Sequence, residues 1–160
     1  DAIAALVNGV ENMPSVRRSV VISGAGDRRD EDITAQTRIL GAAFDDVILY
    51  RDACQRGRAD GEVLGLLRDG LKGATRTRHV EEIHGEFVAI DHALERLNKG
   101  DLCLILIDQV EEALAHIRQR VEQAKPATAR RSTRAPAKRT KTAAAKREPA
   151  LAGERLHAHW

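Results

Sequence analysis

A dense group of alternating charges follows a short apolar run near the start of the chain: Asp27, Arg28, Arg29 and Asp30. The run before it, residues 20–22, is β-branched and suits a buried strand, and the glycines in between allow a sharp turn. Open α/β sheets bind ligands in the crevice at the carboxyl ends of their strands. Guanidinium groups at such a place bind phosphate or carboxylate, and neighbouring carboxylates order them. We therefore predict an anion-binding wall at this turn; the alternative is a helix cap with solvated charges.

A second charged loop follows the next apolar run, DVILY, and contains Arg51, Asp52, Arg56 and Arg58. Because parallel strands end at the same edge of a sheet, we expect this loop to lie beside the first. Its arginines suit a polyanion, and its carboxylates suit a guanidinium ligand. The alternative is a mobile surface loop with Gly57 as its hinge.

The other residues with metal-binding or nucleophilic side chains favour a structural interpretation. His79 and His84 flank two glutamates, but an exposed strand end explains them better than a metal site. Cys54 and Cys103 match no zinc or redox spacing, which favours a reducing cytoplasm. No stretch has the roughly 18 apolar residues of a membrane span, and no secretion signal opens the chain. We therefore expect no metal ligand, a cytoplasmic location and no membrane partner.

Apolar spacing predicts alternating helices and strands over the first 124 residues. The predicted strands are 17–23, 46–50, 77–83 and 102–107, and the predicted helices are 1–11, 31–43, 63–71, 87–97 and 110–121. The weakly apolar third strand suits a sheet edge, LCLILI is the strongest strand, and Val110, Leu114, Ile117 and Val121 form the apolar stripe of the last helix. Helical crossovers imply a parallel sheet covered on both faces. The predicted fold class is α/β, a Rossmann-like three-layer lobe with a mostly parallel sheet whose first strand lies upstream.

Charge divides the chain into two predicted parts, a domain at 1–124 and a tail at 125–160. The domain has 16 Lys and Arg against 22 Asp and Glu, whereas the tail has 10 against 2. The tail is rich in Ala, Lys, Arg, Thr and Pro, so we predict that it is disordered. For the tail, a role as a solvated spacer is favoured over a role as a tether for polyanions. Binding of nucleic acid is the least favoured role, because Trp160 is the first aromatic residue in the tail and bases have nothing else there to stack on.

Three stretches carry a resemblance to a known family: GDRRDEDI at 26–33, FDDVILYRDACQRGRADGEV at 44–63 and GDLCLILIDQVEEAL at 100–114. Together with the opening DAIAAL, they resemble the C-terminal lobe of the cyanophycin synthetase family. That lobe is similar to the C-terminal domain of Mur ligases. The resemblance extends from residue 1 to about residue 121.

The resemblance implies an ATP-dependent amide ligase, in which a carboxylate becomes an acyl phosphate that an amine attacks. In this family, arginine is joined to the aspartate β-carboxylates of a polyaspartate backbone. ATP and Mg²⁺ would be bound mainly by a central Mur domain. The substrates would be arginine and the aspartate polymer. The protein partners would be the ATP-grasp and central domains of the same chain and further copies in a homo-oligomer. This segment has no G-x-x-x-x-G-K-[ST] loop and no initiator Met, so we expect a piece of a longer protein that holds no catalytic residue and is inactive alone.

Departures from the Mur pattern fall in the second and third motifs. Gly26, Asp27 and Arg28 match the GDRD motif, but RDACQRGR at 51–58 stands where Mur ligases have DNPR, and DQVEE at 108–112 stands where they have GKGHE. In Mur ligases the second region helps to hold the incoming amino acid. The changed loop is consistent with a different amine substrate.

Within this resemblance, the charged turn would lie on a lobe that closes over the site and excludes water. An arginine substrate would suit the carboxylates of Asp52, Asp60 and Glu62, whereas a polyaspartate chain would suit Arg56 and Arg58. The second assignment is favoured because the loop contains more arginine than acid. The alternative function is a non-catalytic Rossmann-like module whose basic tail binds polyanions or nucleic acid.

Overall fold

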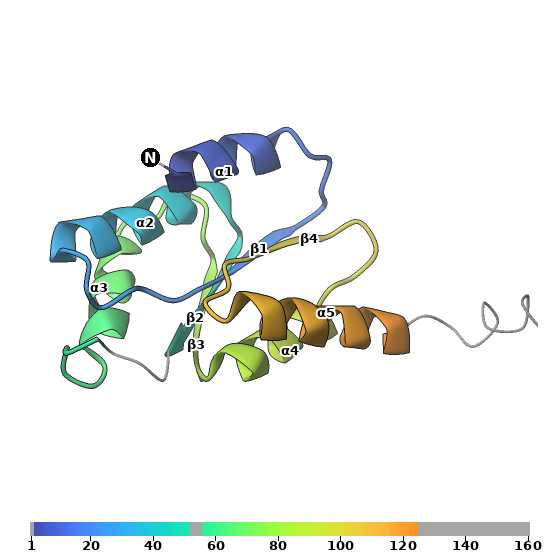
Figure 1. Cartoon of the computed structure of the whole chain (residues 1–160). Helices are drawn as coiled ribbons and strands as arrows, with labels where there is room; N and C mark the ends of the chain where they lie inside the picture. The colour runs from blue at the N-terminus through green and yellow to red at the C-terminus, as the bar shows by residue number, and fades with distance from the viewer. Residues whose placement is uncertain (1, 52–55, 125–160) are drawn as a thin grey trace, which may run out of the picture. The chain divides into compact units, whose positions relative to one another are not determined.

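The computed structural model describes residues 2–51 and 56–124. The predictions for Asp52, Cys54 and the tail at 125–160 therefore lie outside the described residues. In the described part, helices and strands alternate in the predicted order (Figure 1). The helices are α1 (Ala2–Glu11), α2 (Asp30–Ala43), α3 (Glu62–Gly70), α4 (Glu86–Glu95) and α5 (Val110–Ala124), and the strands are β1 (Arg18–Ile22), β2 (Asp46–Arg51), β3 (His79–His84) and β4 (Leu102–Ile105).

The four strands form one sheet in the order β3-β2-β1-β4, and every pairing is parallel. Val20 of β1 lies opposite Val47 of β2 on one side and Leu104 of β4 on the other. The predicted edge position of β3 is confirmed. The chain therefore runs outward from β1 to β3, then crosses the sheet to place β4 on the other side of β1.

Helices cover both faces of the sheet, which confirms the three-layer α/β fold (Figure 1). Val20 and Ile22 of β1 pack on one face with apolar residues from α1, α2 and α3, among them Ile33 and Leu40, both fully buried as predicted. Val21 lies on the other face with apolar residues of β2 and α4. This alternation follows from the two-residue period of a strand.

Two glycines allow α3 to approach its neighbours closely. A Cβ at Gly70 would lie 2.2 Å from the backbone oxygen of Thr34 in α2, and a Cβ at Gly24 would lie 2.7 Å from Cγ1 of Val63. Gly24 belongs to the turn after β1, so its lack of a side chain lets that turn rest directly on α3.

Two details differ from the sequence predictions. β4 ends at Ile105 rather than at residue 107, and each of its residues is only half-buried because the strand lies at an edge of the sheet. In α5 the apolar stripe is largely exposed, with Val110, Leu114 and Val121 at 54%, 41% and 47% of full exposure. Hydrophobic period identifies this helix but does not say which neighbour covers its apolar side.

Candidate functional site

A cavity of about 190 Å³ opens at the carboxyl edge of the sheet, between the ends of β1 and β4. This is the place where the strand order reverses, because β2 follows β1 on one side and β4 lies on the other. In open α/β sheets the crevice at such a reversal is the usual ligand site. Its lining combines the turn after β1 with the turn after β4 and includes the polar residues Ser23, Arg28, Gln36 and Asp108.

Arg58 joins the two charged loops that the sequence predicts to be neighbours. Its Nε donates to the carbonyl oxygen of Gly26 at 2.7 Å, and its Nη2 donates to the carbonyl oxygen of Arg28 at 2.6 Å. The same guanidinium forms ion pairs with Asp30 at 2.7 Å and Glu62 at 2.6 Å. Hydrogen bonds to Asp30 and Glu62 raise the pKa of this arginine above its ordinary value. The guanidinium of Arg58 therefore donates to groups of the lobe itself and fixes the turn that carries Arg28.

Arg56 connects the same loop to two more turns. Its Nη1 lies 3.2 Å from Oδ2 of Asp27, and its Nη2 lies 3.6 Å from Oδ1 of Asp108. Its backbone has a φ of +48°, an unusual left-handed conformation for a residue with a side chain. The loops after β1 and β2 therefore lie side by side, as predicted. The turn after β4 lies next to them and contributes Asp108.

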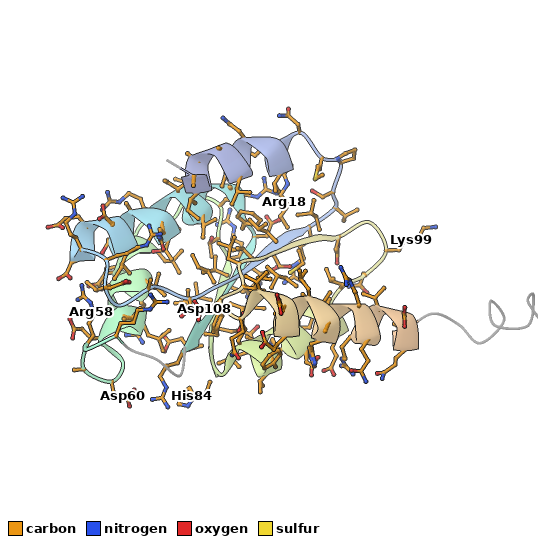
Figure 2. The ribbon with its side chains drawn as sticks, in the orientation of Figure 1. Arg18, Arg58, Asp60, His84, Lys99 and Asp108 are labelled. Atoms are coloured by element: carbon orange, nitrogen blue, oxygen red, sulfur yellow. The ribbon has the colours of Figure 1, made fainter. Side chains whose placement is uncertain are left out.

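Two other arginines of the predicted site have local carboxylate partners. Arg51 Nη1 lies 2.6 Å and 2.7 Å from the two carboxylate oxygens of Asp60, and Asp60 is labelled in Figure 2. Arg29 forms a two-bond pair with Asp32, at 2.9 Å for each bond, and its side chain is 77% exposed. The hydrogen bonds from Arg29 lower the pKa of Asp32. Both guanidinium groups are therefore already paired with carboxylates of the lobe.

Arg28 differs from the other arginines at this edge. Its side chain makes no hydrogen bond or ion pair to any residue within 2–51 and 56–124, yet it lines the cavity at the end of β1. Its own backbone carbonyl is held by Arg58. The arrangement is a fixed turn whose Arg28 guanidinium has no hydrogen-bond or ion-pair partner among the described residues, which suits it to a phosphate or carboxylate ligand.

Glu86 is a residue of this site that the sequence does not reveal. It is the first residue of α4 and only 5% exposed, and its carboxylate accepts hydrogen bonds from the backbone N–H of Asp108 at 2.7 Å and of Gln109 at 3.2 Å. These two N–H groups stand at the start of α5, where no helical acceptor exists. Glu86 therefore caps α5 from another element and fixes the turn that holds Asp108. The only signal in the sequence is an acidic residue directly after Gly85.

The remaining sequence candidates fall outside this cluster. Asp52 lies outside the described residues, and no group of three or more His, Cys, Asp or Glu side chains within 2–51 and 56–124 could hold a metal ion. Burial raises the pKa of the Cys103 thiol, so that this thiol stays protonated. No helix in the described part is long and apolar enough to cross a membrane.

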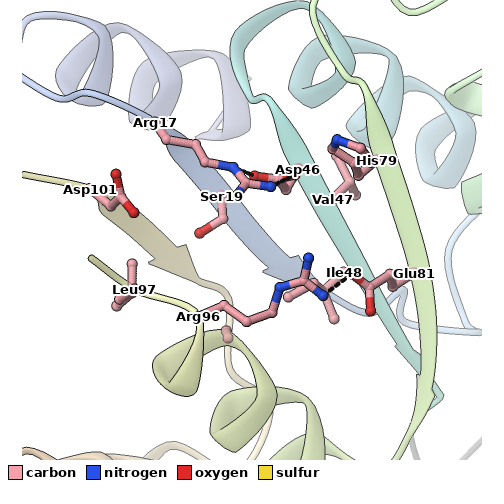
Figure 3. A pocket seen from close by; sticks show the side chains of 11 residues that line it. Arg17, Ser19, Asp46, Val47, Ile48, His79, Glu81, Arg96, Leu97 and Asp101 are labelled. Atoms are coloured by element: carbon pink, nitrogen blue, oxygen red, sulfur yellow. Dashed lines mark hydrogen bonds and ion pairs between the residues drawn. The ribbon is translucent and has the colours of Figure 1, made fainter.

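The opposite, amino edge of the sheet has a different character (Figure 3). A cavity of only about 20 Å³ lies there, between the first residues of β1, β2 and β3. Ion pairs border it, one between Arg17 and Asp46 and one between Arg96 and Glu81 at 2.6 Å. The space has room for little more than one water molecule. The residues at this edge therefore have a structural role, because the space between them is too small for a ligand.

Comparison with known proteins agrees with the resemblance seen in the sequence. No family model matches the chain. Over 104 residues, the chain is 36% identical to the cyanophycin synthetase of Crocosphaera subtropica, a match that covers 65% of this chain and 12% of that protein. Over 125 residues it is 31% identical to the cyanophycin synthetase of Trichormus variabilis, which covers 74% and 14%. The chain is a homologue of a segment of the cyanophycin synthetases. It spans only about an eighth of the length of these relatives.

Solved structures identify the fold of the chain. UDP-N-acetylmuramoyl-L-alanyl-D-glutamate–2,6-diaminopimelate ligase superposes with a TM-score of 0.61 at 20% identity, covering 76% of this chain and 28% of that one. FolC of E. coli, solved in complex with ADP, superposes with a TM-score of 0.54 at 20% identity, covering 76% and 26%. The predicted likeness to a Mur ligase lobe is therefore confirmed at the level of the fold.

Proposed function

We propose that this lobe is the closing domain of an ATP-dependent amide ligase that joins arginine to the aspartate side-chain carboxylates of a polyaspartate backbone. The similarity to cyanophycin synthetases supports the choice of reaction. The fold shared with two ligases supports the role of the lobe as part of a larger enzyme. The upstream ATP-grasp and central domains of the same chain, a cytoplasmic location and assembly into a homo-oligomer belong to the same proposal.

The observation that carries the proposal is the guanidinium of Arg28, in the turn after β1, which has no ion-pair partner among the described residues. Four neighbouring arginines form ion pairs, whereas Arg28 lines the cavity and forms no ion pair with the residues at 2–51 and 56–124. Its charge acts on Asp32 only at longer range, where it helps to lower the pKa of that carboxylate. A ligase of this class handles phosphate and carboxylate groups, and a planar guanidinium binds either group with two parallel hydrogen bonds. Arg28 is therefore the residue of this lobe that we assign to the anionic part of the substrate.

The rest of the cluster positions Arg28. Arg58 holds the turn from one side, and Arg56 connects it through Asp27 to Asp108 on the far side of the cavity. A rigid turn loses little conformational freedom when a ligand arrives, so more of the binding energy remains for orientation. Closure of such a lobe would also exclude water from a reactive acyl phosphate.

ATP and Mg²⁺ are assigned to the upstream part of the enzyme. The described residues offer no cluster that could hold a metal ion, and the sequence has no phosphate-binding loop. When bound there, ATP supplies the phosphoryl group that activates the carboxylate. This lobe contributes the positive charge of Arg28 and the shape of the cavity, and by itself it should not turn over ATP.

The test uses the full-length protein that contains this lobe. With ATP and an aspartate polymer present, phosphate release should depend on added arginine and should not be supported equally by lysine. Incorporation of labelled arginine into the polymer should match the phosphate released. Phosphate release that is indifferent to arginine, or no incorporation of arginine, would contradict the proposed reaction.

A further inference from the structure

Asp108 brings a carboxylate to the cavity at the carboxyl edge of the sheet, from the turn between β4 and α5 (Figure 2). Its side chain is 44% exposed. Its one ion pair within 2–51 and 56–124 is with Arg56, whose Nη2 lies 3.6 Å from Oδ1, too far for a hydrogen bond. Both carboxylate oxygens of Asp108 can therefore still accept hydrogen bonds from a ligand in the cavity.

The backbone of Asp108 is held independently of its side chain. The buried carboxylate of Glu86 accepts the N–H of Asp108 at 2.7 Å and the N–H of Gln109 at 3.2 Å. Glu86 itself has no ion pair with the residues at 2–51 and 56–124, and the guanidinium of Arg56 is shared between Asp108 and Asp27. The wall formed by this turn therefore carries more negative than positive charge, which favours a cationic group in front of it.

The turn after β1 gives another wall of the same cavity the opposite sign. Arg28 lines it and has no ion pair with the described residues. Leu106 and Ile107 add apolar lining. The cavity of about 190 Å³ is smaller than the roughly 300–1,000 Å³ of pockets that enclose drug-sized ligands. A small molecule with an anionic group, a cationic group and methylene groups between them matches this lining.

The carboxylates that the sequence offers for an arginine ligand have other partners. Asp60 lies 2.6 Å from Arg51, and Glu62 lies 2.6 Å from Arg58. Neither residue lines the cavity. Among the described residues, Asp108 is the acidic residue that lines it.

We propose that Asp108 binds the guanidinium group of the amino acid substrate and so selects arginine, while the α-carboxylate of the same molecule faces Arg28. This inference rests on the proposed function. A carboxylate accepts two parallel hydrogen bonds from a planar guanidinium, a geometry that the ammonium group of lysine does not offer. The α-amine that attacks the acyl phosphate then lies beside the α-carboxylate, at the end of the molecule away from Asp108.

The experiment compares arginine with citrulline in the full-length protein that contains this lobe, with ATP and an aspartate polymer present. Citrulline has nearly the shape of arginine, but its side chain is uncharged. A site built to bind a charged group rejects an analogue that lacks it. Wild type should prefer arginine by at least about tenfold in kcat/KM, and Asp108→Asn should lower this preference about tenfold.

Arginine amide tests the other end of the substrate, because it lacks the charge of the α-carboxylate. The preference for arginine over arginine amide should be the same in wild type and Asp108→Asn. A general distortion of the site would instead lower both preferences. Asp108→Glu keeps the negative charge and should retain more of the preference over citrulline than Asp108→Asn does.

Two matched variants separate recognition of the guanidinium from other effects of the charge. Glu111→Gln removes an exposed carboxylate three residues away, in the first turn of α5, and should leave both preferences unchanged. Arg56→Gln breaks the ion pair of Asp108 from its other side and should not lower the preference for arginine over citrulline.

The outcomes separate this inference from the proposed function. A wild-type enzyme that does not incorporate arginine would overturn both. An enzyme that incorporates arginine, but whose preference over citrulline is the same in Asp108→Asn as in wild type, would overturn the inference alone. So would an equal loss of both preferences in Asp108→Asn, or the same loss in Arg56→Gln, because either result would assign Asp108 a structural role only.

Discussion

Glu86→Ala tests whether one buried carboxylate fixes the edge of the candidate site. The wild-type carboxylate accepts two backbone hydrogen bonds, at 2.7 Å from Asp108 and 3.2 Å from Gln109. A hydrogen bond to a charged group contributes about 1.5–3 kcal/mol to stability, and the cost of burying the carboxylate offsets part of that gain. We therefore expect the free energy of unfolding to fall by about 2–4 kcal/mol.

The assay is urea denaturation of the chain together with amide hydrogen exchange. The amides of Asp108 and Gln109 should lose protection in Glu86→Ala even where the rest of the lobe remains folded. Glu86→Gln keeps one acceptor oxygen and should lose roughly half as much stability. Glu95→Ala is the matched control, because Glu95 lies at the other end of α4 in an exposed pair with Arg120 and should cost less than about 1 kcal/mol. Equal stabilities for the two alanine variants would refute the capping role of Glu86.

Three further perturbations address the packing and electrostatics of the lobe. Burial alone would raise the pKa of Asp45, but hydrogen bonds from Arg76 and a backbone N–H lower it. The difference in unfolding free energy between wild type and Asp45→Asn should therefore reach its full size above about pH 5 and shrink as the pH falls through the lowered pKa. A difference that stays constant during acid denaturation would contradict this. Gly70→Ala should strongly destabilise the lobe in thermal denaturation, since its Cβ would lie 2.2 Å from a backbone oxygen of α2, and an unchanged melting temperature would show that the helices can separate. Arg58→Lys in the full-length enzyme should lower kcat/KM but have no further effect when Arg28 is already alanine; additive losses would mean that Arg58 acts independently.

Much of the fold follows from the order of apolar and polar residues. Period-two and period-3.6 patterns predict each helix and strand, and the alternation of the two predicts a parallel sheet covered on both faces. The neighbourhood of the two charged loops follows as well, because parallel strands end at one edge. The weak apolarity of β3 correctly predicts an edge strand.

The roles of individual arginines do not follow from the sequence. Arg28 and Arg58 both stand among acids in charged loops. Only the distances in three dimensions show that Arg58 forms ion pairs and that Arg28 forms none with the described residues. Glu86 caps a helix 22 residues later in the chain, a relation that no local pattern contains. The exposure of the apolar stripe of α5 cannot be predicted either, because the spacing of apolar residues identifies a helix but not the elements that pack against it.

A comparison of two adjacent arginines tests the central claim most directly. In the full-length enzyme, Arg28→Ala removes a guanidinium assigned to substrate, and a charged hydrogen bond of about 1.5–3 kcal/mol corresponds to a loss of roughly 10- to 150-fold in kcat/KM for arginine incorporation. Arg29→Ala removes the neighbouring guanidinium, which is exposed and already paired with Asp32, and should change kcat/KM by less than about twofold. A large loss for Arg28→Ala alone is the predicted result. Equal effects of the two variants would contradict the assignment of Arg28 to the site.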